Sequence, residues 1–126
     1  MNSLNTDKLK ILHQKILEFN TVRGWDPLDQ NIAKSIVIEA AELLEHFQWD
    51  NDPSLPPKER DLEDVGDEIA DILWYIFLLC NKLNINLADA VEHKYLHNVE
   101  KYPAELFRDK HSNHYYSQKK KYRLEK

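Results

Sequence analysis

Residues 64–80 read DVGDEIADILWYIFLLC, an acidic turn that continues directly into a strongly apolar run. At about 100° per residue, a helix places the apolar positions on one stripe and puts Glu68 and Asp71 at its edge. We therefore expect a helix from about Lys58 to Leu83, with an acidic first turn that suits the helix dipole. The apolar positions of the stripe are Val65, Ile72, Ile76, Leu79 and Leu83.

The second half of this helix has no polar face. Ile72–Cys80 is apolar nearly all round, which is typical of a helix at the centre of a core or shared between subunits. A four-helix domain has few places in which one helix is completely surrounded. We therefore predict a homo-oligomer that associates through this segment.

Residues 39–49, EAAELLEHFQW, repeat the spacing of the carboxylates. On a helix from about Asp29 to Trp49, Glu39 and Glu42 lie at the margin of an apolar stripe formed by Ile36, Ala40, Leu43 and Phe47. Glu45 has drifted round the helix and is expected to face water. The two acidic pairs thus have the same layout.

Carboxylates at the edge of a core are costly unless a charged group meets them. Four of them in one small volume repel one another unless a divalent cation neutralises the cluster. Oxygen ligands without paired Cys or His suit Mg²⁺, or Mn²⁺ as a substitute. Residue spacing alone leaves a second interpretation open, in which these acids are merely solvated helix-face residues.

The chain has 126 residues, 42% of them hydrophobic and 31% charged, which is the size and composition of one soluble globular domain. It has only two glycines and no alternating strand pattern, so an all-α, four-helix fold is expected. The other two helices are predicted over Thr6–Asn20, with Thr6 as N-cap, and from Asn86, as N-cap, to Pro103.

Charged residues are distributed unevenly along the chain. Residues 1–103 carry 10 Lys and Arg against 19 Asp and Glu, whereas residues 104–126 carry 7 against 3. We expect a domain over 1–103 and a basic C-terminal tail over 104–126. The acidic body argues against stable nucleic-acid binding.

Cys80 is the one cysteine, so no internal disulfide is possible and a reducing compartment is expected. The polar segment Met1–Lys10 does not resemble a signal peptide, and the apolar run at 72–80 is too short to span a bilayer. These features predict a cytoplasmic protein without a membrane partner.

Several residues outside the acidic pairs suit nucleotide binding. Lys94, Asn98 and Tyr102 recur every four residues on one face, where an ammonium and an amide can bind phosphate or a sugar hydroxyl. Lys94 can equally extend to solvent or pair with an acid. Four aromatic residues can stack on a base, although each also suits core packing: Trp25, Trp49, Tyr75 and Tyr102.

These motifs together resemble the MazG-like all-α nucleoside triphosphate pyrophosphohydrolases. The similarity rests on E-x-x-E at Glu39 and Glu42 and on E-x-x-D at Glu68 and Asp71, and it covers about residues 6–103. Within the family, the dCTP pyrophosphatase branch is most similar. The three segments that indicate this branch are RGW at 23–25, ELLEHFQW at 42–49 and KYLHNVEKYP at 94–103.

The resemblance implies a role for each matching residue. Glu39, Glu42, Glu68 and Asp71 would bind Mg²⁺, and Lys94 and Asn98 would contact phosphates. The nucleotide pocket would be formed by Trp25, Trp49, Tyr75 and Tyr102. The implied reaction is hydrolysis of a (d)NTP, such as dCTP or a modified dNTP, to the monophosphate and pyrophosphate. Its implied role is nucleotide-pool clean-up. The implied assembly is a homo-oligomer, either a dimer or a tetramer.

Two alternatives remain. A helical protein-interaction module without catalysis predicts that Mg²⁺ has no effect on stability. A carboxylate-bridged di-iron protein normally has Glu-x-x-His on two helices, and neither acidic pair has this His.

Overall fold

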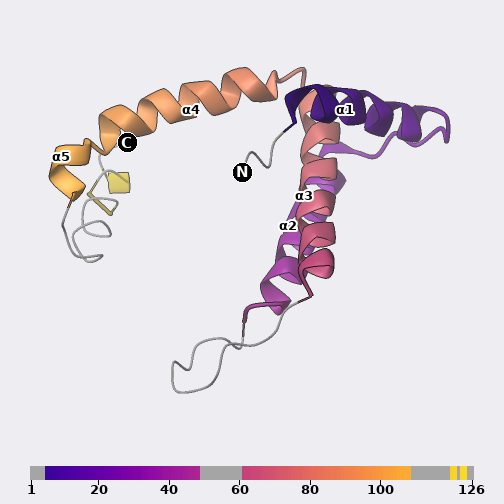
Figure 1. The fold of residues 1–126 in the computed structure, drawn as a ribbon. Helices are drawn as coiled ribbons and strands as arrows, with labels where there is room; N and C mark the ends of the chain where they lie inside the picture. The colour runs from indigo at the N-terminus through magenta and orange to yellow at the C-terminus, as the bar shows by residue number, and fades with distance from the viewer. Residues whose placement is uncertain (1–4, 49–60, 109–119, 122, 125–126) are drawn as a thin grey trace. The chain divides into compact units, whose positions relative to one another are not determined.

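The computed structural model describes residues 5–48, 61–108, 120–121 and 123–124. Within these ranges there are helices and no β-strands, which confirms the all-α class (Figure 1). The helices are α1 (Thr6–Thr21), α2 (Asp29–Glu45), α3 (Leu62–Lys82), α4 (Leu87–Lys101) and the short α5 (Ala104–Phe107).

Side-chain caps fix the starts of three helices. Asn5, rather than the expected Thr6, caps α1, because its side chain accepts a hydrogen bond from the backbone N–H of Lys8 at 3.0 Å. Asp61 caps α3 in the same way and sets its first residue at Leu62, later than expected. Asn86 caps α4 as predicted, accepting from the N–H of Asp89.

The ends of α1 and α2 are set by their last backbone hydrogen bonds. Beyond α1, Gly24 has a φ of +64°, which a residue without Cβ adopts at little cost, and the N–H of Trp25 donates back to Asn20 O at 3.0 Å. Helix α2 ends at Glu45, earlier than the expected Trp49. A turn follows, in which the N–H of Gln48 donates to Leu44 O at 2.8 Å.

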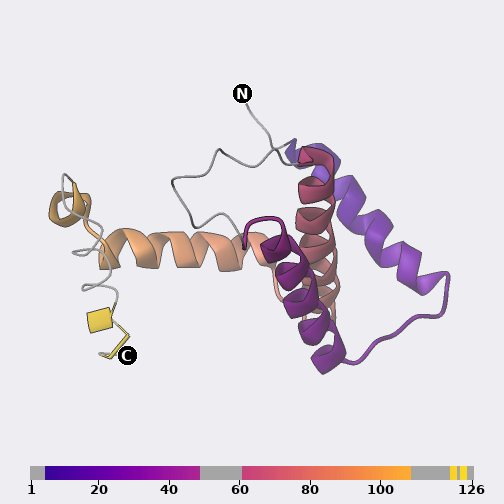
Figure 2. The same cartoon turned by 90° about the horizontal axis from the view of Figure 1, so that it is seen from below.

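The chain divides into two compact units, Met1–Ile85 and Asn86–Lys126. In the first unit, α2 and α3 lie side by side and antiparallel (Figures 1 and 2). Lys82 Nζ at the end of α3 lies 3.7 Å from Asp29 Oδ1 at the start of α2. At the opposite end, His46 Nε2 lies 3.7 Å from Glu68 Oε1. This antiparallel register brings the two acidic motifs level with each other.

Helix α1 packs on α3 through aromatic rings. His13 stacks on Phe77 with ring centroids 4.4 Å apart, and Phe19 meets Trp74 edge to face at 5.2 Å. Aromatic pairs at these separations stabilise beyond the area they bury. The contacts hold α1 along α3, and both Phe19 and Trp74 also line the cavity described below.

The hydrophobic core of the described chain is small. Ile32, Phe77 and Leu78 are the only buried hydrophobic residues among those described. In the apolar segment Ile72–Cys80, Phe77 and Leu78 are buried and the other residues are half-buried. A single chain therefore covers this apolar segment incompletely.

The second unit contains α4 and α5. Every side chain from Ala88 to Glu100 is exposed, while the ring of Tyr102 meets that of Phe107 edge to face at 5.5 Å. Helix α5 was not anticipated and lies in the segment expected to be a tail. None of the helices described in either unit has the length and apolarity required to cross a membrane.

Candidate metal centre and the cavity beside it

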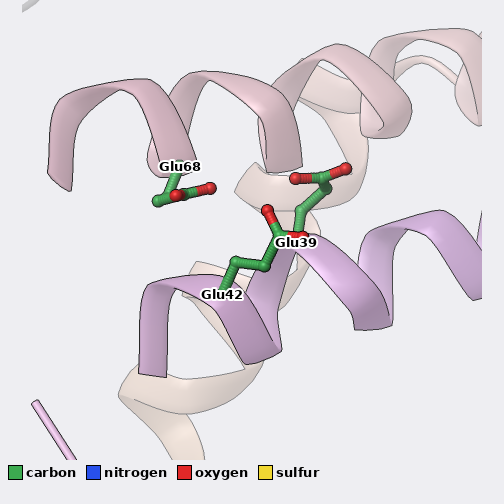
Figure 3. A group of neighbouring side chains, drawn as sticks. All are labelled: Glu39, Glu42 and Glu68. Atoms are coloured by element: carbon green, nitrogen blue, oxygen red, sulfur yellow. The ribbon is translucent and has the colours of Figure 1, made fainter. Parts of the chain in front are cut away.

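Three carboxylates come together between α2 and α3. Glu39 and Glu42 lie three residues apart on α2, so they project from the same side, and the antiparallel α3 places Glu68 opposite them (Figure 3). Each residue offers one oxygen, and these oxygens lie within 4.8 Å of one another. Glu68 of the second predicted pair thus faces Glu39 and Glu42 of the first, and the spacing of the three oxygens can accommodate one small cation.

The cluster carries an electrostatic cost. Partial burial raises the pKa of Glu39 above its usual value, and the negative charges of Glu42, Asp71 and Glu68 raise it further. A side-chain hydrogen bond with Glu42 acts in the same direction, because it requires a shared proton. A divalent cation at this position would neutralise the repulsion among the carboxylates and replace the shared proton.

Asp71 lies close to the cluster but outside its tightest group. It is one turn beyond Glu68 on α3, and its charge is among those that raise the pKa of Glu39. Its side chain also lines the adjoining cavity. Asp71 therefore connects the carboxylates with the space in which a ligand would bind.

His46 was not anticipated from the sequence. Its Nε2 lies 3.7 Å from Glu68 Oε1, and both side chains are largely screened from solvent, at 26% and 21% exposure. When protonated, His46 forms an ion pair with Glu68. Its position directly after Glu45 in EHFQW is the only signal the sequence provides.

The buried face of α2 differs slightly from the expected stripe. Glu39 lies within the half-buried stripe that contains Ile36 and Leu43, whereas Ala40 and Phe47 are exposed. The reason is that α2 packs chiefly on α3. Helix α3 covers only a narrow part of the circumference of α2, and that part includes Glu39. The same packing leaves Glu42 and Glu45 exposed.

A cavity of about 690 Å³ lies against α1, α2 and α3, with Asp71 in its wall. Trp25 and Tyr75, both predicted to bind a ligand, line it. Its polar residues come from α1, the α1–α2 connection, α2 and α3. The remaining lining residues are Phe19, Asn20, Gly24, Asp26, Pro27, Asn31, Ile32, Ser35, Trp74 and Leu78.

The α1–α2 connection is held to α1 by Arg23. Its Nη1 donates to Phe19 O at 2.9 Å, and its guanidinium lies 3.5 Å from the centre of the Phe19 ring. The same ring meets Trp25 edge to face at 5.9 Å. These contacts place Trp25 at the mouth of the cavity, where it is 58% exposed.

The remaining predicted ligand-binding residues are Trp49, Lys94, Asn98 and Tyr102. Trp49 is outside the described residues. Lys94 and Asn98 are exposed on α4, and Tyr102 is its half-buried C-cap, whose N–H donates to Asn98 O at 2.8 Å. The 4-residue spacing of these three residues gives them one face, and that face belongs to the second unit.

Sequence reasoning missed several members of the cavity wall. Phe19 lies within the range predicted as the first helix and Trp74 within the apolar run 72–80, and neither was predicted to line a ligand site. Asn20 and Asn31 flank the α1–α2 connection, and their positions only weakly indicate a ligand site. Amides on both sides of an aromatic loop are available to bind polar edges of a ligand.

Comparisons with known proteins show which family the chain resembles. The model of the MazG-like family matches residues 34–118. The mouse (Mus musculus) protein dCTP pyrophosphatase 1 is 35% identical over 98 residues, which cover 72% of this chain and 56% of the mouse protein. The human (Homo sapiens) protein of the same name is 33% identical over 96 residues, with the same coverage. The chain thus spans little more than half the length of these relatives.

The fold is also found in a solved structure. The crystal structure of a pyrophosphatase from Archaeoglobus fulgidus superposes with a TM-score of 0.62 at 35% sequence identity. The match covers 82% of this chain and 98% of that one. From the extent of the family match and the paired carboxylates on α2 and α3, the chain belongs to the MazG-like family.

Proposed function

We propose that the chain is a Mg²⁺-dependent nucleotide pyrophosphohydrolase that cleaves a (d)NTP to the (d)NMP and pyrophosphate. The observation that carries the proposal is the convergence of Glu39, Glu42 and Glu68 beside a cavity whose wall includes Asp71. The pyrophosphatase names of the relatives and of the solved structure support the same reaction.

The donor set fits a hard divalent ion. Glu39, Glu42 and Glu68 offer carboxylate oxygens alone, within 4.8 Å of one another, and Asp71 is close enough to influence Glu39. Magnesium is held through carboxylates and substrate phosphates, and manganese accepts the same ligands. When bound, the ion supplies neutralisation of phosphate charge and an acidified water.

The cavity suits a nucleoside. Its volume of about 690 Å³ falls within the range of small-molecule sites, and Trp25 and Tyr75 supply flat surfaces for stacking on a base. Trp49 and Tyr102 are assigned the same role by their motifs. Of the remaining motif residues, Lys94 and Asn98 are proposed to bind the phosphates, the lysine as a point charge and the asparagine as a hydrogen-bond donor.

The chain's own groups can carry the proton transfer. A water oxygen attacks phosphorus, the α–β anhydride bond breaks, and pyrophosphate leaves with the bonding electron pair. A carboxylate oxygen of the cluster that is not engaged in metal binding accepts the proton of the water. The aromatic walls of the cavity hold the nucleoside and the site positions the triphosphate, because positioning and charge stabilisation dominate this chemistry.

We assign dCTP and modified dNTPs as the first substrates to test, with nucleotide-pool clean-up as the role. The support is the name dCTP pyrophosphatase 1, shared by the mouse and human relatives at 35% and 33% identity. Asn20 and Asn31, which line the cavity, can each offer both a donor and an acceptor to a base edge.

A homo-oligomer, a dimer or a tetramer, belongs to the same proposal. The support is apolar surface left uncovered in each unit, for example Ile69 at 53% exposure on α3 and Leu96 at 60% on α4. Light scattering of the purified protein should give two or four chain masses at micromolar concentration. A single chain mass would contradict the proposed homo-oligomer.

We retain the cytoplasm as the expected compartment and expect no stable nucleic-acid binding.

Product analysis tests the reaction. A panel of canonical and modified NTPs and dNTPs, incubated with Mg²⁺, should give monophosphate and pyrophosphate in equal amounts, and EDTA should stop the release. Diphosphate and orthophosphate as products would contradict the proposed bond cleavage. No hydrolysis of any member by folded protein would favour the interaction module.

A further inference from the structure

One lysine joins the end of α3 to the loop that forms the cavity wall. Lys82 Nζ donates to Asp26 Oδ1 at 2.8 Å and to Pro27 O at 2.6 Å, and it lies 3.7 Å from Asp29 Oδ1. These partners are more than 50 residues away in sequence. The ammonium therefore binds a side chain and a backbone carbonyl of the loop. It also lies close to an acidic side chain in the first turn of α2.

The other hydrogen bonds and ring contacts described for this loop join it to α1 and α2 rather than to α3. Val22, Trp25 and Leu28 are all more than half exposed, so apolar burial contributes little. Leu28, the N-cap residue of α2, provides no side-chain capping hydrogen bond. A small cavity of about 130 Å³, lined in part by Trp25, Pro27 and Lys82, leaves the packing under the loop incomplete.

We propose that Lys82 is a positioning residue that holds the loop of residues 22–28 against α3 and so fixes the wall of the cavity that carries Trp25. Gly24, Trp25, Asp26 and Pro27 all line that cavity, so a shift of the loop changes its shape. The consequence for nucleotide affinity rests on the proposed function, whereas the tether itself does not.

The charge state suits this role. The hydrogen bond to Asp26 raises the pKa of Lys82 above its usual value, so the ammonium stays charged throughout the neutral range. The lysine side chain is 25% exposed, but that of Asp26 is 89% exposed. A pair as open as this is weakened by salt, so the tether should loosen in 1 M NaCl.

Hydrogen exchange of the ligand-free protein tests the tether directly. Lys82→Met keeps the aliphatic stem and removes the charge, and it should speed exchange several-fold at residues 22–28 while leaving the middle of α3 unchanged. Lys82→Arg should restore most of the protection, and Asp26→Asn should lose part of it. Lys34→Met, an exposed lysine on α2, is the matched control and should behave as wild type.

Kinetics test the consequence for the ligand. With dCTP, Lys82→Met should raise KM about fivefold, which is about 1 kcal/mol, with kcat within about twofold of wild type. Lys82→Arg should recover most of the affinity. A rise in KM without faster loop exchange would mean that Lys82 contacts the nucleotide itself, and it would overturn the positioning role.

Two further outcomes separate the tether from the enzyme. Unchanged exchange in Lys82→Met, or a uniform increase throughout α1–α3, would overturn the tether even if the protein hydrolyses nucleotides. Selective loop exchange in a protein that hydrolyses no nucleotide would support the tether and overturn the proposed function.

Discussion

His46 Nε2 lies 3.7 Å from Glu68 Oε1, so the residue that follows α2 meets the second turn of α3. In this register Glu68 faces Glu39 and Glu42 (Figure 3). A shift of α3 by one residue would rotate Glu68 about 100° away from the other two carboxylates. The register between α2 and α3 therefore determines the candidate metal centre.

Glu68→Gln should abolish metal-dependent hydrolysis, because it removes one anionic ligand and preserves the shape of the side chain. Without metal, the free energy of unfolding should be unchanged or higher by up to about 1 kcal/mol, since one repulsive charge is lost. Pyrophosphate release and urea unfolding with EDTA measure the two effects. Glu45→Gln, an exposed acid outside the cluster, is the control, and full turnover in Glu68→Gln would show that the site is wrongly assigned.

Glu39→Gln should change the pH dependence of stability in the metal-free protein. The pKa of Glu39 is raised in the folded state, so the folded protein holds this proton more tightly than the unfolded chain does. Stability is therefore lost as pH rises from the unfolded value of 4.5 through the raised folded value, and the penalty remains at neutral pH. Melting temperatures in EDTA should show that Glu39→Gln removes this loss, and equal profiles for both proteins would contradict the repulsion among Glu39, Glu42, Glu68 and Asp71.

Trp25→Ala should raise KM about tenfold and change kcat less, because the indole supplies stacking area at the mouth of the cavity. Steady-state kinetics with dCTP measure the two constants. Val22→Ala is the matched control, since Val22 is exposed in the same connection and does not line the cavity. An unchanged KM in Trp25→Ala would remove Trp25 from the nucleotide pocket.

Trp49→Ala is expected to act in the same way, by weakening nucleotide binding more than chemistry. The basis is its place at the end of the ELLEHFQW motif. Equilibrium titration with a non-hydrolysable dCTP analogue separates binding from turnover. Wild-type affinity in this variant would contradict its pocket role.

The helices and the spacing of the acidic residues along them could be predicted from sequence because both depend on local periodicity. Apolar spacing and cap residues located α1 to α4, and E-x-x-E and E-x-x-D each placed two carboxylates on one side of α2 and of α3. The buried face of α2 was predicted less well. It depends on the arc that α3 covers, and this brought Glu39 into the half-buried stripe and left Ala40 exposed.

Contacts between distant residues could not be predicted in this way. Lys82 follows an apolar run and looks like an ordinary basic residue at a helix C-terminus, yet it reaches Asp26, 56 positions away in the chain. Asn20 and Asn31 were not predicted to be site residues, and only the fold brings both to one cavity. Periodicity gives the face of a helix, and only the packing of helices gives the partner of a side chain.

The most direct test of the metal centre is a Mn²⁺ titration followed by electron paramagnetic resonance, without nucleotide. Wild type and Glu45→Gln should both show saturable Mn²⁺ binding that excess Mg²⁺ displaces, and Glu68→Gln should lose it. Equal Mn²⁺ binding by Glu68→Gln and wild type, or no saturable binding by folded wild type, would contradict the assignment of Glu39, Glu42 and Glu68 as metal ligands.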